Sequence, residues 1–160
     1  MEKKEIKTYH DNGKLKEEFT LKEGKRHGAC KQYYPNGNLL TECTYKNGVL
    51  DGKYRNYYEE GHLWVEYTYK NDKMHGFRKT YHENGKLNEE CCYIDGLKNG
   101  LYRGYYDNGK LWEEYRYVKG KINGIYKKYH ENGKLRVECT FKNGKRHELY
   151  SVYHENGELS

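Results

Sequence analysis

The sequence has few of the residues that build an ordinary hydrophobic core. Its 160 residues include one proline, two methionines, two tryptophans and three phenylalanines. Fewer than one residue in five is Leu, Ile, Val or Phe, and 34% are charged, a composition typical of disorder. Twenty tyrosines replace the missing aliphatic residues, however, and 30 basic residues nearly balance 24 acidic ones. We therefore expect an ordered chain rich in β-structure.

Other absences exclude several classes of protein. No apolar run is long enough to span a bilayer, and the N-terminal residues lack the apolar segment of a secretory signal. Five cysteines, an odd number without CxxC spacing, indicate neither a disulfide framework nor a zinc module. We expect a cytoplasmic protein without cofactor or metal. The net charge of +6 is spread along the chain, which gives little support to nucleic-acid binding.

Glycine and tyrosine recur with a fixed period. Each of seven glycines follows a tyrosine by four residues, and successive glycines are 24 residues apart. These glycines are Gly13, Gly37, Gly61, Gly85, Gly109, Gly133 and Gly157. Such self-similarity indicates an array of structural repeats.

One repeat, residues 29–52, predicts a pair of strands. Two runs rich in Tyr, Thr and Cys are separated by the dipeptides Asn36-Gly37 and Asn47-Gly48. Asn-Gly favours a type I′ hairpin turn because both residues tolerate positive φ, and glycine every dozen residues excludes helices. We predict an all-β fold: an elongated, single-layer antiparallel β-meander of 24-residue hairpin repeats. Residues 1–160 would form a single repeat domain of about six and a half repeats, with half-repeat ends at 1–8 and 149–160, and we expect a monomer.

The turn at Asn36-Gly37 sets a register that the sequence itself supports. It places Lys31 opposite Glu42, and the same positions of the other repeats again pair a cation with glutamate. The six predicted pairs are Lys7–Glu18, Lys31–Glu42, Arg55–Glu66, Lys79–Glu90, Arg103–Glu114 and Lys127–Glu138. Exposed pairs of this kind contribute about 0.2–1 kcal/mol each, so we interpret them as structural.

The register also sorts the two faces of the sheet. The more apolar face would carry Phe19, Cys43, Tyr67, Cys91, Tyr115 and Cys139. The face with the charged pairs would carry the cross-strand pairs Tyr33–Leu40, Tyr57–Trp64 and Tyr105–Trp112.

Several segments resemble a known repeat. Tyr-Lys-Asn-Gly-Val-Leu-Asp-Gly at 45–52 is similar to the MORN repeat, and Tyr-His-Glu-Asn-Gly-Lys-Leu at 81–87 and 129–135 resembles its bacterial variant in YwqK-like antitoxins. The resemblance covers essentially the whole chain. It implies a twisted antiparallel sheet that binds proteins, associates with phospholipid or neutralises a partner toxin, and it implies no catalytic motif.

No position has the marks of a catalytic or metal site. Histidines at equivalent turn positions would lie two strands, roughly 9–10 Å, apart, too far to share a zinc ion. No base is placed to activate a cysteine, and no residue breaks the repeat as a catalytic group would. Cys30 and Cys43 would face each other, which leaves a disulfide geometrically possible, although a reducing compartment disfavours it.

Three binding functions follow from the exposed side chains. The first is protein binding, because aromatic residues beside arginine are typical of interface hot spots, and the resemblance implies antitoxin or inhibitor as the concrete role. The candidate residues are Tyr33, Arg55, Tyr57, Trp64, Arg103, Tyr105 and Trp112; the alternative is that these aromatics only stabilise the sheet. The second is a membrane-associated adaptor that binds anionic phospholipid through Lys25, Arg26, Lys145 and Arg146. Single-stranded nucleic acid ranks third, since a glutamate faces every cation of the charged pairs.

Overall fold

The computed structural model describes residues 2–160, and these residues form fifteen β-strands and no helix. The chain makes two compact units, Met1–Gly76 and Phe77–Ser160. The strands of the first unit are β1 (Lys3–Tyr9), β2 (Leu15–Lys22), β3 (Lys25–Tyr33), β4 (Leu39–Lys46), β5 (Val49–Tyr57), β6 (Leu63–Lys70) and β7 (Lys73–Met74). Those of the second are β8 (Gly76–Tyr81), β9 (Leu87–Ile94), β10 (Leu97–Tyr105), β11 (Leu111–Val118), β12 (Lys121–Ile122), β13 (Gly124–Tyr129), β14 (Leu135–Lys142) and β15 (Lys145–Val152).

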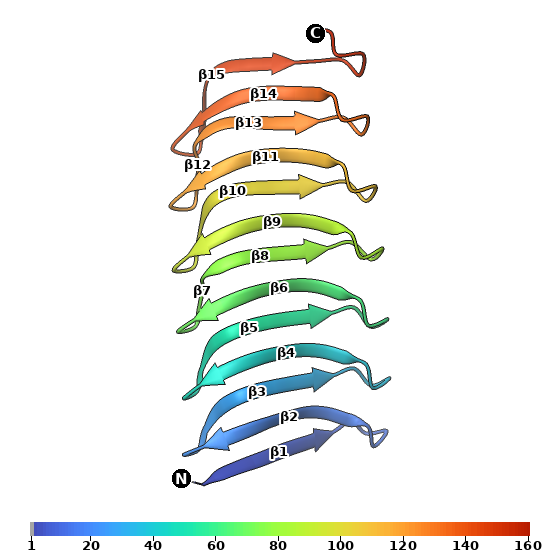
Figure 1. Ribbon diagram of the computed structural model, residues 1–160, viewed down its shortest axis with the longest axis vertical. Coiled ribbons are helices and arrows are strands. Elements are labelled where there is room, and N and C mark those ends of the chain that lie inside the picture. Colours follow the sequence, from blue (N-terminus) through green and yellow to red (C-terminus); the bar gives the residue numbers. More distant parts are fainter. Residues whose placement is uncertain (1) are drawn as a thin grey trace. The chain divides into compact units, whose positions relative to one another are not determined.

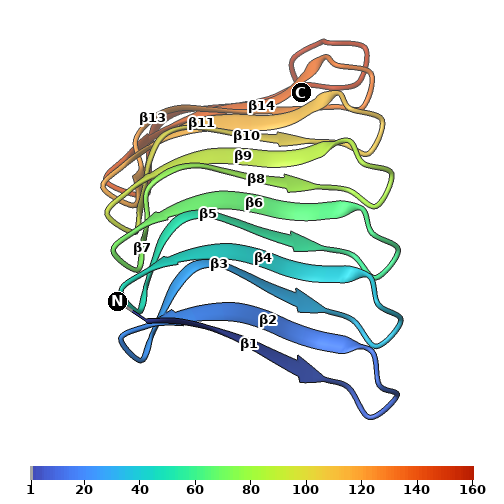
Figure 2. The same cartoon turned by 60° about the horizontal axis from the view of Figure 1, so that its bottom comes forward.

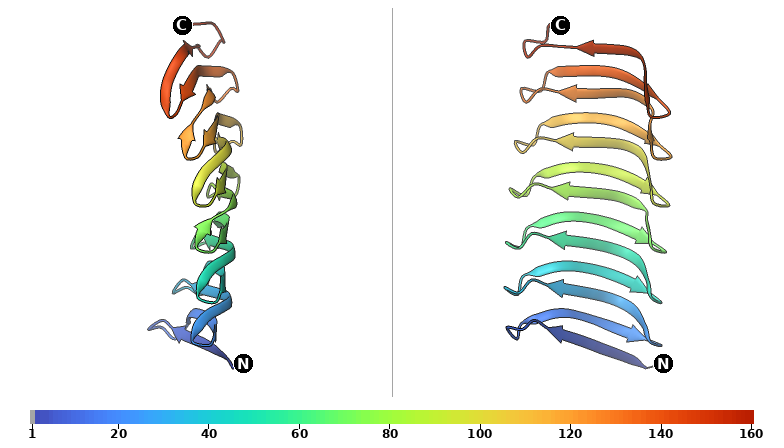
Figure 3. Two further views of the ribbon diagram at one scale, coloured as in Figure 1. Left: turned by 90° about the vertical axis from the view of Figure 1, so that its left-hand side faces the viewer. Right: turned by 180° about the vertical axis from the view of Figure 1, so that it is seen from behind.

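The all-β antiparallel meander is confirmed. Within each unit, consecutive strands lie side by side in chain order, and the hairpins repeat about every 24 residues (Figure 1). No second layer covers the sheet in either unit (Figure 2). Seen from behind, the turns of each unit gather at two edges, which we name the first-turn edge (Asn36-Gly37 type) and the second-turn edge (Asn47-Gly48 type) (Figure 3).

The two kinds of Asn-Gly turn differ. At the second-turn edge Asn47 (φ 53°) and Gly48 (φ 91°) both have positive φ, so the predicted type I′ turn is confirmed there. At the first-turn edge only Gly37 (φ 98°) does; its N–H donates to the Tyr34 carbonyl, and the Tyr34 N–H donates to the Asn38 carbonyl. The first turn is thus a type I turn closed by a left-handed glycine, and the type I′ expectation is wrong there.

This longer turn adds a residue to the strand that follows it. Asn56 pairs with Val65, but Tyr57 pairs with Leu63, which leaves Trp64 without a partner in the register. A β-bulge of this kind locally re-aims the side chains that it contains. It overturns three predicted cross-strand pairs: Tyr33–Leu40, Tyr57–Trp64 and Tyr105–Trp112.

Beyond the bulge the charged pairs keep their predicted register. Five are confirmed: Lys7–Glu18, Lys31–Glu42, Arg55–Glu66, Arg103–Glu114 and Lys127–Glu138; Lys79–Glu90 stays a prediction. Each glutamate can also face a cation on the strand that follows it: Glu42, for example, pairs with Lys31 on one side and with Arg55 on the other. We call these alternating residues the charged ladder, and the side that carries them the ladder face.

The opposite side, which we call the core face, holds the buried side chains. In the first unit Cys30, Cys43 and Val65 are buried there, and the Tyr54 and Tyr67 rings stack at 4.8 Å between centroids. In the second unit the Tyr102 and Tyr115 rings stack at 4.6 Å. Tyrosine suits a single layer because its ring buries apolar area while its hydroxyl reaches a polar partner.

Candidate functional site

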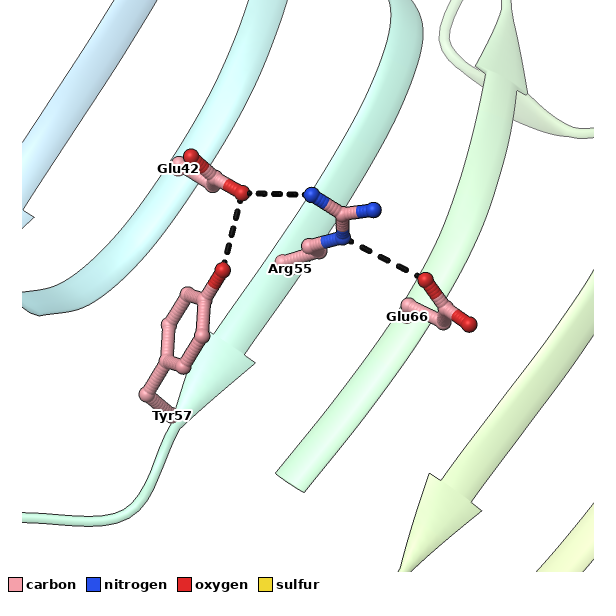
Figure 4. Close-up of polar contacts among 4 residues, drawn as sticks. All are labelled: Glu42, Arg55, Tyr57 and Glu66. Atoms are coloured by element: carbon pink, nitrogen blue, oxygen red, sulfur yellow. Dashed lines mark hydrogen bonds and ion pairs between the residues drawn. The ribbon is translucent and has the colours of Figure 1, made fainter. Parts of the chain in front are cut away.

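Arg55 and Tyr57, two of the predicted partner-binding residues, are engaged within the sheet (Figure 4). The Arg55 guanidinium lies 2.9 Å from Glu42 and 3.3 Å from Glu66, and the Tyr57 hydroxyl donates to Glu42 at 2.8 Å. Mainly through its hydrogen bond from Arg55, the pKa of Glu42 is lowered. Burial, followed by the hydrogen bond to Glu42, raises the pKa of Tyr57.

The same arrangement recurs at the other predicted positions. Tyr33 donates to Glu18 at 2.7 Å, and Tyr105 donates to Glu90 at 3.0 Å, while Arg103 lies 3.7 Å from the same Glu90. Burial, and then the bond to Glu18, raises the pKa of Tyr33 to about 12. The polar atoms of these side chains therefore cross-link neighbouring strands of the ladder face.

The tryptophans lie apart from these arginines. Trp112 sits at the bulge of β11, where the Lys128 ammonium is 4.8 Å from the centre of the indole and the Tyr106 ring 6.4 Å away. Lys128 neighbours Tyr126 on the core face, so the bulge has turned Trp112 away from Arg103. Trp64 holds the same bulge position, 6.1 Å from the Tyr58 ring, and its side chain is 46% exposed.

Histidine and asparagine side chains join successive repeats at the first-turn edge. The His10 ring Nε2 donates to the Tyr33 carbonyl at 2.8 Å, and the Asn12 amide donates to the Pro35 carbonyl at 2.7 Å. His82 and His130 make the equivalent bonds in the second unit. Sequence reasoning missed these bonds, although the recurrence of the same residues at the same repeat positions was their signal.

Cys30 and Cys43 are directly opposite each other, and both are free thiols. The Arg26 guanidinium lies 3.4 Å from the Cys30 sulfur, 2.9 Å from Glu17 and 4.1 Å from the centre of the Phe19 ring. A hydrogen bond from Cys30 lowers the pKa of Cys43 and raises that of Cys30. The guanidinium of Arg26, a predicted lipid-binding residue, is thus engaged by side chains of the first unit.

The remaining predicted lipid-binding residues lie at second turns. Lys25 lies beside the next second turn, at Gly48. Lys145 and Arg146 line a shallow depression of about 500 Å³ together with Lys121, Lys142 and His147. This depression concentrates positive charge at the second-turn edge of the second unit.

Comparison with known families gives the decisive match. The MORN repeat variant matches six consecutive segments: 4–23, 26–47, 50–71, 74–95, 98–119 and 122–143. The chain belongs to the MORN repeat variant family. MORN repeats generally mediate binding to proteins or membranes. No curated protein matches this MORN-repeat chain, and residues 2–160 contain no helix able to cross a membrane.

Proposed function

We propose that this chain is a non-catalytic MORN-repeat module that binds another protein and inhibits it by steric occlusion, as an antitoxin does. The observation that carries the proposal is the placement of the two tryptophans. Each unit presents one at a first-turn bulge, beside Tyr58 or Tyr106, and Trp64 is 46% exposed. Tryptophan and tyrosine are enriched among residues that dominate binding energy.

The repeat supports a binding role over a catalytic one. Catalysis needs a position unlike its counterparts, with a nucleophile or acid beside a base. Here the tyrosines, glutamates and histidines of successive repeats make the same structural bonds, as with Tyr33, Tyr57 and Tyr105. The proposal also places the chain in the cytoplasm, where buried free cysteines such as Cys30 and Cys43 stay reduced.

A co-purification experiment tests the proposal. The product of the neighbouring gene is co-expressed with the tagged chain, and we expect the two proteins to co-purify. The W64A/W112A double variant should weaken this complex by at least tenfold, since such anchors contribute about 2 kcal/mol or more. Asn88→Ala and Arg136→Ala change the same repeat position where no tryptophan stands, and should retain binding. Unchanged binding by the tryptophan variant would remove these residues from the site.

The basic depression supports a second candidate, an adaptor on anionic membranes. Lys121, Lys142, Lys145 and Arg146 lie close together, and basic residues near a membrane contribute about 1 kcal/mol each. Sedimentation with vesicles of phosphatidylcholine and phosphatidylserine measures this binding. The K145E/R146E variant should lose it, and added salt should weaken it. The second-turn residue Lys119, changed to Glu, serves as the control outside the depression.

A further inference from the structure

One repeat position changes character between the two units. In the first unit it is held by Glu5, Ala29 and Lys53. In the second it is held by large apolar residues with exposed side chains: Phe77 (65%), Leu101 (37%), Ile125 (55%) and Leu149 (46%). We call these four the apolar row. Isolated exposed hydrophobic residues are ordinary, but four at one repeat position form a line across the strands.

The apolar row runs along the ladder face. Leu101 pairs with Arg116 and Ile125 pairs with Thr140, in each case two register positions before the ladder pairs Arg103–Glu114 and Lys127–Glu138, and therefore on the same face. Between Leu101 and Ile125 lies an open groove of about 340 Å³ that Arg116 also lines. The guanidinium of Arg116 makes no ion pair with any residue that the structure describes. Its donors are therefore available to a bound molecule.

The period of the apolar row selects the kind of ligand. Its members stand on alternate strands, so they repeat every 9.6 Å or so. A polyproline II helix advances about 9.3 Å in its three-residue turn. Seven residues of an α-helix advance about 10.5 Å, and alternate residues of a strand about 6.6 Å. Over the three intervals of the row, the polyproline II segment stays within about 1 Å of register, whereas the α-helix drifts by nearly 3 Å.

Hydrogen bonding and charge agree with this choice. A polyproline II segment makes no internal hydrogen bonds, so its carbonyl oxygens can accept from Arg116. The second-turn edge beside the row carries Lys121, Lys142 and Lys145, which favours acidic side chains on the ligand.

We propose that the ladder face of the second unit binds a polyproline II segment of a partner protein, with an apolar side chain at every third residue and acidic side chains between them. The apolar residues of the ligand pack between neighbouring members of the apolar row, one of them in the groove between Leu101 and Ile125. This inference rests on the proposed function, since both make the chain a protein-binding module, but it uses a different face and different residues.

Fluorescence anisotropy with a defined probe tests the proposal. The probe is a labelled synthetic peptide of five Leu-Pro-Glu triplets, and the comparison peptides are a scrambled sequence of the same composition and a helix-forming peptide with leucine at every seventh residue. We expect the triplet peptide to bind more tightly than either. The L101K/I125K variant should weaken its binding at least about tenfold. Lysine suits this position, because Lys53 occupies it opposite Thr68 in the first unit.

Matched variants distinguish the apolar row from the same repeat position of the first unit and from the tryptophan site. Ala29→Lys changes the same repeat position in the first unit and should leave triplet binding unchanged. W64A/W112A should also leave it unchanged, which distinguishes this site from the tryptophan site. If L101K/I125K proves unfolded by circular dichroism, the milder Ile125→Thr variant should still reduce binding.

Four results would overturn the proposal. They are the absence of triplet binding by the unsubstituted chain, equal binding of the scrambled peptide, tighter binding of the helical peptide, and triplet binding that survives the row substitutions in a folded protein. If the triplet peptide does not bind but the chain sediments with phosphatidylserine vesicles in a way that the row substitutions abolish, the face binds a membrane instead. If the chain self-associates in the ultracentrifuge and the row substitutions abolish this, the face binds a second copy.

Discussion

Tyr57 and Glu42 join the ends of two successive hairpins through a hydrogen bond of 2.8 Å (Figure 4). Because Glu42 also accepts from Arg55 at 2.9 Å, one carboxylate holds two side chains of β5 against β4. The bond spans 15 residues of sequence and recurs at Tyr33–Glu18, Tyr105–Glu90 and Tyr129–Glu114. In a sheet with one layer, such bonds stabilise the contact between repeats that a second layer would otherwise support.

Glu42→Gln should lower the free energy of unfolding by about 1 kcal/mol near neutral pH, since it weakens two hydrogen bonds at a half-exposed site. The pKa of Glu42 is lowered in the folded chain, first through Arg55. Its stabilisation is therefore present above the pKa of the unfolded chain and is lost as the pH falls through the folded value. Urea unfolding at neutral and acidic pH should show the gap between parent and variant shrinking in acid. Glu5→Gln, at an exposed carboxylate of β1, should show no such gap at either pH.

The sequence predicted the meander and the charged ladder because both depend on repeated local patterns. The spacing of Asn36-Gly37 and the cation–glutamate coincidence fixed the pairing of Lys31 with Glu42. The faces of Trp64 and Trp112 could not be predicted in this way, since the turn type is inferred from residues 29–52, where the same Asn-Gly dipeptide closes two different turns. At the first turn the Asn36 side chain accepts the Asn38 N–H at 2.8 Å, which favours the longer loop and its bulge.

Asn12 should contribute to stability through two separable bonds. Its carbonyl oxygen accepts the Lys14 N–H at 3.1 Å within the turn, and its amide donates to the Pro35 carbonyl of the next repeat at 2.7 Å. Asn12→Asp keeps the acceptor and removes the donor, so we expect a loss of about 1 kcal/mol in the free energy of unfolding. Asn12→Ala removes both bonds and should cost about 2 kcal/mol.

Asn108 provides the control for the Asn12 variants. It accepts the Lys110 N–H at 2.8 Å, but its amide donates to no residue that the structure describes. Asn108→Asp should therefore leave the midpoint of urea unfolding nearly unchanged. A loss equal to that of Asn12→Asp would show that the cost arises within the turn and not between repeats.

Gly52 and Gly28 hold the same repeat position but should respond differently to alanine. Both have positive φ, 126° and 86°, so alanine is strained at each by about 1 kcal/mol. At Gly52 a Cβ would also stand 3.0 Å from the Thr44 Cβ, whereas at Gly28 it would meet nothing within 4 Å. Gly52→Ala should therefore be the more destabilising in thermal unfolding by a further 1 kcal/mol or more. Thr44→Gly should remove the extra cost in the double variant; if the two substitutions are additive, the contact is not its cause.

Cys30 and Cys43 should be the cysteines that form a disulfide under mild oxidation. They are directly opposite in β3 and β4, and the lowered pKa of Cys43 favours the thiolate that begins the exchange. With diamide as the two-electron oxidant, the two thiols lose two hydrogens to the diazene, and intact mass should fall by about 2 Da. Peptide mapping should place the bond between Cys30 and Cys43, and Cys43→Ser should abolish it. Both sulfurs are buried, so a requirement for denaturant would show that burial outweighs the favourable placement. A bond to another cysteine would contradict the predicted pairing.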